Sequence, residues 1–213
     1  MAAADTVTQI LNSAGEVFAE KGFKDATVRE ICAKAGANLA AVNYHFGDKE
    51  RLYIEAVKKA RSVLEASVPL PDDLDTAEPE AALRILIQTL AQRMLNRDVE
   101  SWRHGLLVRE FTNPSKACEE MMQESIVPFM SRLHVAIRQL LPGSVPEHTI
   151  HQLGLSIISQ IAYYRLQDRV VGMLVPEKEL AEHFTAEALA NHVARFSIGA
   201  IRAYESIDNF CET

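Results

Sequence analysis

Long apolar runs are missing from this chain of 213 residues. A helix that spans a bilayer needs about 20 consecutive apolar residues, and no stretch of the sequence approaches that length. The first residues, MAAADTVTQ, also lack the basic start and the apolar core of a secretory signal peptide. The sequence therefore predicts a cytoplasmic protein without a membrane partner.

Cysteine is scarce: Cys32, Cys118 and Cys211 are odd in number and far apart, which disfavours a disulfide framework and fits a reducing compartment. Gly-rich phosphate loops and G-x-S-x-G elbows are absent, and no carboxylate stands in a catalytic motif. His148 and His151 have a spacing that suits one helical face, but two ligands alone make a poor zinc site. We therefore expect no enzyme, no metal and no cofactor.

Positive charge is in deficit, because 22 Lys and Arg face 29 Asp and Glu and give a net charge of −7. That total alone argues against a nucleic-acid binder. The deficit is unevenly distributed. Residues 1–61 hold nine basic and eight acidic residues, a balance of +1, and the remaining 152 hold 13 and 21, a balance of −8. The N-terminal segment is therefore the part suited to lie on phosphates.

The alternating pattern of a strand is absent too, and apolar residues recur at spacings of three and four. This periodicity predicts an all-α fold. A break is expected at Pro128, because proline cannot continue a helix without a lost hydrogen bond. A loop is expected around Gly172 and Pro176. The expected helices cover about 6–21 (stopped by Gly22), 27–35, 38–46, 48–68, 79–96, 98–113 (capped by Asp98), 114 onwards, 147–167 and 185–207.

Two short helices joined by a turn of about three residues stand near the N-terminus. Thr27 and Glu30 form a capping box for the first helix, and Asn38 is a suitable N-cap for the second. Ala35 and Gly36 are expected to let the helices cross closely. The pattern is a helix-turn-helix, with apolar residues that can bury themselves against Phe18 of the preceding helix: Val28, Ile31, Ala35, Val42 and Phe46.

The stretch TVREICAKAGANLAAVNYHFGDKERLYIEAV resembles the DNA-binding domain of TetR-like transcriptional regulators, in a register that runs from Ile10 to Val57. The resemblance implies an all-helical dimer with two domains. A three-helix helix-turn-helix domain over residues 1–47 would bind an operator, and a larger helical domain over residues 48–213 would bind a ligand and dimerise. Asn43 departs from the family pattern, where many members carry an aromatic or basic residue, so the preferred base sequence stays open.

The resemblance also assigns DNA contacts. Thr27 and Arg29 map to the helix that touches the backbone, and Lys49 maps to a phosphate contact at the start of the fourth helix. The recognition helix carries the remaining contacts: Asn38, Leu39, Ala40, Asn43, Tyr44 and His45. The alternative is that Tyr44 and His45 are half-buried residues at a helix end.

The last two long helices have more than one apolar stripe, and a helix buried on two sides needs a partner as well as its own core. The resemblance implies that they pair with the same helices of a second copy. The alternative is that both stripes pack inside one monomer. The residues expected at the dimer interface are Leu153, Ile157, Ile161, Tyr164, Val193, Phe196 and Ala200.

Methionines and aromatic residues gather between Leu83 and Leu141, and such residues suit an adaptable apolar pocket. The alternatives are that they form ordinary core and that the charged residues among them make internal ion pairs. The residues expected to bind a ligand are Met94, Trp102, Arg103, Leu106, Arg109, Phe111, Met121, Met122 and Phe129.

Together these features predict a ligand-responsive, homodimeric transcription factor. We expect a repressor that a small apolar or aromatic molecule releases from a palindromic operator in double-stranded DNA. Two alternatives stay open: an architectural DNA-binding protein of the same fold without an inducer, and an all-α ligand carrier or enzyme that has lost DNA binding. The first would have a filled core in place of the pocket, and the second would lack positive potential on its helix-turn-helix.

Overall fold

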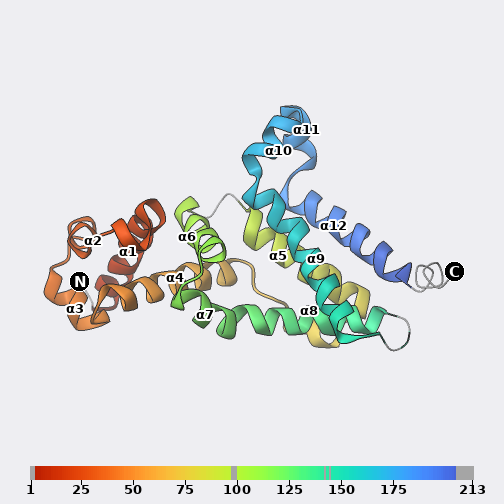
Figure 1. Ribbon diagram of the computed structural model, residues 1–213, viewed down its shortest axis with the longest axis horizontal. Coiled ribbons are helices and arrows are strands. Elements are labelled where there is room, and N and C mark those ends of the chain that lie inside the picture. The colour runs from red at the N-terminus through yellow and green to blue at the C-terminus, as the bar shows by residue number, and fades with distance from the viewer. Residues whose placement is uncertain (1–2, 97–99, 142, 144, 205–213) are drawn as a thin grey trace. The chain divides into compact units, whose positions relative to one another are not determined.

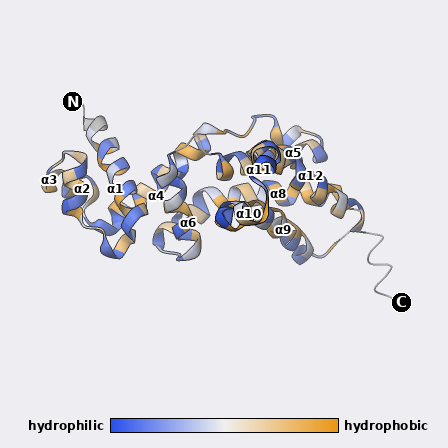
Figure 2. Ribbon diagram, turned by 90° about the horizontal axis from the view of Figure 1, so that it is seen from above, coloured by the Kyte–Doolittle hydropathy of each residue, from blue (hydrophilic) through white to orange (hydrophobic). Residues whose placement is uncertain are grey.

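The computed structural model describes residues 3–96, 100–141, 143 and 145–204. Throughout these ranges the regular elements are helices, which confirms the all-α fold. Figure 2 shows hydrophilic and hydrophobic residues alternating along the helices, as expected for helices that bury one side and expose the other.

The described chain forms two compact units. The first combines Met1–Ser67 with Arg97–Ile126, and the second combines Val68–Asn96 with Val127–Thr213. The chain therefore leaves the first unit and later returns to it. The division at residues 47 and 48 concerns function and stays a prediction.

The first unit packs its helices around one apolar core (Figure 1). Phe18, Ile31 and Leu52 are completely buried in it, and Leu106 joins them from the returning segment. The elements of this unit are α1 (Ala3–Asp25), α2 (Val28–Ala35), α3 (Leu39–Phe46), α4 (Lys49–Ser67), α6 (Ser101–Thr112), α7 (Lys116–Met121) and the π-helical turn η2 (Met122–Ile126).

The second unit has its own core, in which Leu83, Ile137 and Ile150 are completely buried. The short helices α10 and α11 project from its other helices in Figure 1. The elements are η1 (Leu74–Thr76), α5 (Pro79–Leu95), α8 (Val127–Leu140), α9 (Glu147–Leu166), α10 (Asp168–Leu174), α11 (Glu177–His183) and α12 (Ala186–Arg202).

One expectation is only partly right: the loop expected around Gly172 and Pro176 is a two-residue connection, Val175 and Pro176, between the helices α10 and α11, and Gly172 lies inside α10. A glycine inside a helix costs only about 1 kcal/mol, which packing or neighbouring residues can offset. Pro176 precedes the first helical residue of α11, where the missing N–H costs nothing. Gly172 therefore does not end α10, and Pro176 does not prevent α11 from beginning at the next residue.

The break expected at Pro128 is present, in the form of η2. Proline has no N–H to donate to the carbonyl of Glu124, so a regular α-helix loses a bond there. The chain makes a π-helical turn over Met122–Ile126 and resumes the α-helix at Val127, one residue before Pro128. The cap expected at Asp98, the last helix beyond residue 204 and Cys211 lie outside the described residues.

Candidate nucleic-acid interface

A capping box starts α2. The Thr27 hydroxyl accepts a hydrogen bond from the Glu30 amide at 3.2 Å, and the Glu30 carboxylate accepts one from the Thr27 amide at 3.0 Å. Lys21 of α1 pairs with the same carboxylate. Hydrogen bonds from Lys21 and Thr27 lower the pKa of the Glu30 carboxyl to about 2. The start of α2 is thereby joined to α1, as the sequence pattern predicts.

The turn between α2 and α3 depends on the backbone of Gly36, which has φ 61° and ψ 26°. This left-handed conformation disfavours any residue with a Cβ. A Cβ placed at Gly36 would have no atom within 4 Å, so the expected need for close helix crossing is wrong for this residue. Ala35 is 3% exposed and is the small residue at the packed position. Gly36 supplies the bend and Ala35 the contact.

The N-cap of α3 is Asn38, whose side-chain oxygen accepts a hydrogen bond from the Ala41 amide at 2.7 Å. Val42 and Phe46 are buried, at 1% and 8% exposed, and belong to the core that contains Phe18 and Ile31. These two anchors are four residues apart, so they fix one face of α3 and leave the opposite face outward.

The outward face of α3 carries the polar groups that the sequence assigns to DNA. Tyr44 is 85% exposed and Leu39 is 47% exposed. The remaining assigned residues of the helix and its cap are also exposed: Asn38, Ala40, Asn43 and His45. The alternative in which Tyr44 and His45 are half-buried is therefore wrong. The face offers an amide, a phenol and an imidazole, which are groups able to meet base edges or phosphates.

The two basic side chains assigned to DNA near α3, Arg29 and Lys49, differ in whether they already have a partner within the chain. The Arg29 guanidinium is exposed and makes no hydrogen bond or ion pair with any described residue. The Lys49 ammonium donates to the Lys24 carbonyl at 3.2 Å and lies 4.8 Å from the centre of the Phe23 ring. Arg29 is thus available to a phosphate as it stands, and Lys49 also joins α4 to the end of α1. The DNA contacts of both remain predictions.

Helix α6 packs on α1 through residues that we expected to bind a ligand. A Cβ at Gly15 would lie 2.6 Å from Trp102 Cη2 and 2.9 Å from Trp102 Cε3, so only glycine leaves room for this ring. The Arg103 guanidinium donates to the Asn12 side chain at 3.4 Å, and the Arg109 guanidinium donates to the Ala19 carbonyl at 3.2 Å. These side chains join two helices of one unit.

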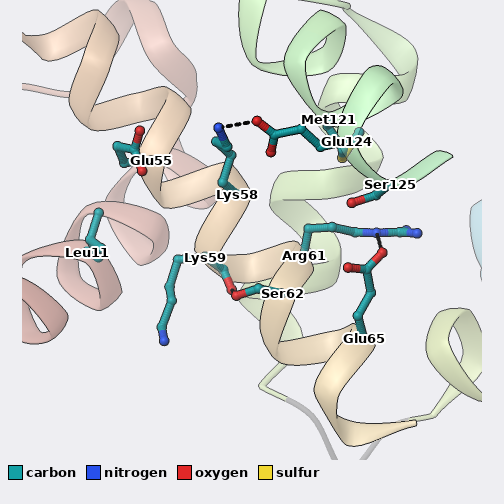
Figure 3. A pocket seen from close by; sticks show the side chains of 10 residues that line it. All are labelled: Leu11, Glu55, Lys58, Lys59, Arg61, Ser62, Glu65, Met121, Glu124 and Ser125. Atoms are coloured by element: carbon teal, nitrogen blue, oxygen red, sulfur yellow. Dashed lines mark hydrogen bonds and ion pairs between the residues drawn. The ribbon is translucent and has the colours of Figure 1, made fainter. Parts of the chain in front are cut away.

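The nine expected ligand residues do not come together in one place. Trp102, Arg103, Leu106 and Arg109 belong to the packing around α6, while Phe111 and Met122 are 48% and 37% exposed. Met94 and Phe129 belong to the core of the second unit, and of the nine residues only Met121 lines the cavity beside α4 (Figure 3). The alternatives of core packing and internal pairing thus describe several of these residues, and the ligand site stays a prediction.

A buried carboxylate lies between α4 and α6, among the charged residues for which the sequence left ligand binding and internal pairing open. Glu110 is 1% exposed, and Tyr53 of α4 donates to it. The Ser115 hydroxyl and amide donate to its other oxygen at 2.7 and 3.3 Å. Burial and the neighbouring carboxylate raise the pKa of Tyr53, which keeps the phenol protonated as a donor. The partners are 57 residues apart, so only the fold reveals them.

The seven residues expected at the dimer interface fall into a buried group and a more exposed group. Ile157, Ile161 and Val193 are at most 2% exposed within the second unit, so they are covered without a partner. Leu153 and Tyr164 are half-buried, whereas Phe196 is 61% exposed and Ala200 is exposed. An apolar stripe alone does not tell which side faces the core, and the first three lie on the inner side. The interface itself stays a prediction.

Comparison with known proteins identifies the family. A model of bacterial regulatory proteins of the tetR family matches residues 10–56. A model of the C-terminal domain of the HTH-type transcriptional dual regulator CecR matches residues 79–201, more than half of the chain. The chain is a member of the TetR family of transcriptional regulators. The helix-turn-helix described above is the segment that the first model matches.

Relatives of this TetR-family regulator are named as transcriptional regulators. It is 32% identical over 134 residues to CecR of Shigella flexneri, a match that covers 59% of the chain and 60% of CecR. It is 36% identical over 83 residues to the HTH-type transcriptional repressor NicS of Pseudomonas putida, which covers 38% of each protein. The chain thus matches less than two thirds of the length of these two relatives.

Solved structures confirm the fold of this TetR-family regulator. A TetR-like transcriptional regulator from Rhodococcus sp. RHA1 superimposes with a TM-score of 0.62 at 15% identity, over 90% of this chain and 93% of that one. FadR from Bacillus subtilis, in complex with stearoyl-CoA, has a TM-score of 0.62 at 16% identity, over 91% and 98%. At such identities the likeness concerns the fold alone.

Among the helices of the described ranges, none is long and apolar enough to cross a membrane. The same residues contain no group of three or more His, Cys, Asp or Glu arranged to hold a metal ion. His134 and His151 do approach each other, with ring centres 4.9 Å apart.

Proposed function

We propose that this chain is a cytoplasmic, ligand-responsive repressor that binds a palindromic operator as a homodimer. The observation that carries the proposal is the outward face of α3, where Asn43, Tyr44 and His45 are exposed on a helix anchored from behind by Val42 and Phe46. A rigid helix with donors and acceptors on its outer face is the form that reads base edges in a major groove.

The sense of regulation is taken from relatives. NicS of Pseudomonas putida and AcnR of Corynebacterium efficiens are named repressors, and the latter is 39% identical over 62 residues. CecR is named a dual regulator. We assign repression to this chain because a bound dimer on an operator blocks other proteins without any further contact, whereas activation requires an additional surface.

Two copies would meet through the outer faces of α9 and α12. On α9, Leu155 and Tyr163 are 58% and 50% exposed and lie eight residues apart, on one side of the helix. On α12, Phe196 is 61% exposed, next to the exposed small residue Ala200 one turn further on. Small and aromatic residues on these faces suit close packing of helices. A dimer places two copies of α3 on two half-sites.

A small apolar or aromatic effector would act through the first unit, where α6 and α7 share a core with the helix-turn-helix. The contacts of Trp102 with Gly15, of Arg109 with Ala19 and of Glu110 with Tyr53 connect α6 to α1 and α4. A ligand shifts the equilibrium only if it binds one arrangement more tightly than the other. A fall in operator affinity of about 100-fold requires about 2.7 kcal/mol of such coupling.

The inducer-free alternative is favoured by one observation and opposed by another. Trp102 and Leu106 of α6 are packed into the core of the first unit, as in an architectural DNA-binding protein with a filled core. However, a cavity of about 400 Å³ lies beside α4 in the same unit, within the range of small-molecule sites. We therefore retain the ligand-responsive function.

The test is to screen aromatic and amphipathic compounds for release of operator DNA while Trp102, the only tryptophan, reports on α6 by fluorescence. A true effector should change the fluorescence and release DNA over the same concentration range. Phe111→Ala tests the expected ligand contact: it should weaken both responses and preserve binding of DNA without ligand. Release of DNA without any change at Trp102, indifferent to substitutions over residues 94–130, would place the effector elsewhere.

A further inference from the structure

The helices α10 and α11 form an arm, residues 168–183, that is barely buried in its own unit. The arm projects from the other helices of the second unit (Figure 1). Val171 is the only buried residue of α10, and α11, which the structure describes in full, has none. One ring contact, between Tyr164 and Phe184 at 6.0 Å, ties the residue after the arm to α9. Helices of seven residues are marginal in water without packing, so the arm lacks burial that it needs.

One face of α10 is apolar and open to solvent. Val170, Met173 and Leu174 are three and four residues apart, which places them on the same side of the helix. Val170 is 39% exposed, and Met173 and Leu174 are each 72% exposed. They leave roughly 300 Å² of apolar surface in water, as much as the largest patch on many monomers, and patches of that size are often functional. This patch on α10 therefore calls for a partner.

An exposed apolar stripe on α9 leads directly to the arm. Leu155 and Leu166 are 58% and 45% exposed and lie three full turns apart, and Tyr163, 50% exposed, lies one turn before Leu166. Helix α9 ends at Leu166 and α10 begins at Asp168, so the stripe and the patch on α10 follow one another along the chain. The face of α9 that we assign to the dimer thus continues onto the arm.

The charges of the arm favour a second copy as its partner. Helix α11 has three acids against one lysine, and Glu177 and Glu179 form no ion pair with any residue that the structure describes. Arg195 of α12 is exposed beside Phe196 and makes no hydrogen bond or ion pair within the described ranges. A two-fold dimer presents the same surfaces twice, so it can place an acidic α11 near a basic α12. An anionic membrane repels these carboxylates instead.

We propose that the arm of each protomer packs against the second copy in the dimer, with Met173 and Leu174 as its main apolar contacts and α11 near the second copy's α12. The inference rests on the proposed homodimer, which it deepens by adding the arm to the faces of α9 and α12. The contact covers the exposed patch on α10 and supplies the packing that two short helices need.

Sedimentation equilibrium on the full chain measures the dimer dissociation constant. Met173→Glu and Leu174→Glu each place a charge at the proposed contact, and each should raise the constant at least about 10-fold. Both positions are exposed within one copy and glutamate is a good helix former, so the fold should be kept. Val135→Glu is the matched control, because Val135 is 55% exposed on α8 of the same unit, and it should leave the constant unchanged.

Amide hydrogen exchange tells whether the second copy protects the arm. In the wild-type dimer the amides of residues 168–183 should exchange at least about 10-fold more slowly than in the monomer obtained by dilution. The amides of α5, which contributes to the core of the second unit, should be protected in both states. Equal exchange of the arm in dimer and monomer would overturn the proposal, because the arm would then need no partner.

The remaining outcomes separate this inference from the homodimer itself. A wild-type dimer whose dissociation constant neither glutamate variant changes would refute the arm contact and leave the dimer standing. A wild type that stays monomeric at every concentration would contradict both. Binding to phosphatidylglycerol vesicles that Met173→Glu abolishes, with no change in the dissociation constant, would assign the patch to a lipid surface and reject the second copy as its partner.

Discussion

Tyr44 exposes 85% of its surface on a helix whose other face is buried at Val42 and Phe46, so its phenol is free to contact a partner. Tyr44→Ala or Asn43→Ala should weaken operator binding by about 1–3 kcal/mol each if these residues contact bases. Thermal stability should hardly change, because exposed substitutions of this kind alter folding by about 0.5 kcal/mol or less. Fluorescence anisotropy with labelled operator measures the affinity, and unchanged affinity in both variants would remove α3 from base recognition.

Glu30 makes a prediction about pH. Its pKa is lowered to about 2 in the folded chain by Lys21 and Thr27, against 4.5 ordinarily. The unfolded chain therefore binds the proton first as pH falls, and the stabilisation by Glu30 is complete above about 4.5 and is lost towards 2. Glu30→Gln should flatten this part of the stability profile in urea titrations between these pH values. A profile that is the same in both proteins would show that the capping box does not contribute.

At the residue scale, the sequence predicts interactions between residues that are close together in the chain. Thr27, Glu30, Gly36 and Asn38 form the caps and the turn that their spacing predicts. The same reasoning could not find the partners of Arg103 or Glu110, because Asn12 and Tyr53 are 91 and 57 residues away. A residue that seems free to bind a ligand in the sequence can be used by a distant helix in the fold.

At the scale of helices, the contact of α1 with α6 depends on the absence of a side chain at Gly15. Alanine is the better helix former by about 1 kcal/mol, yet its Cβ would overlap the Trp102 ring. Gly15→Ala should therefore destabilise the fold by about 1–3 kcal/mol through overpacking. Gly105→Ala on α6 is the control, because a Cβ there meets nothing within 4 Å, and it should stabilise by up to about 1 kcal/mol.

The opposite signs of these two alanine variants are measured by chemical denaturation with Trp102 emission as the probe. If Gly15→Ala is as stable as Gly105→Ala, the ring is not held against α1 as described.

The helices themselves illustrate which boundaries a sequence reveals. Caps and prolines mark the start of α5 at Pro79 and of α12 after Thr185, as expected. The short helices α10 and α11 were missed because seven residues give too few apolar repeats for a period to be read. Gly172 lies inside such a helix, because a glycine there costs only about 1 kcal/mol.

At the scale of the whole molecule, the open question in the sequence was which apolar stripe of α9 and α12 is internal. The fold settles the internal stripe, with Ile157 at 2% and Val193 at 0% exposed, and leaves Phe196 outward. The spacing of apolar residues reveals two apolar stripes on these helices. It does not tell which stripe packs in the core and which lies at an interface, because both environments favour the same residue types. The dimer proposed above uses the outward one.

Two arginine variants separate these stripes. Phe196→Arg should yield a folded monomer, because it places a charge only at the proposed interface. Ile157→Arg should unfold the second unit, because it buries an unpaired charge in the core. Light scattering reports the mass and circular dichroism reports the helix content. A Phe196→Arg variant that keeps the mass of a dimer would place the interface elsewhere.

The central claim is that two copies of α3 read DNA, and selection of binding sites from a pool of random duplexes tests it most directly. The account predicts enrichment of an inverted repeat whose half-sites are centred about 34–36 Å apart or a multiple of that distance. It also predicts that Tyr44→Ala binds the enriched duplexes more weakly. Absence of any enriched inverted repeat for a folded, dimeric wild type would contradict the claim.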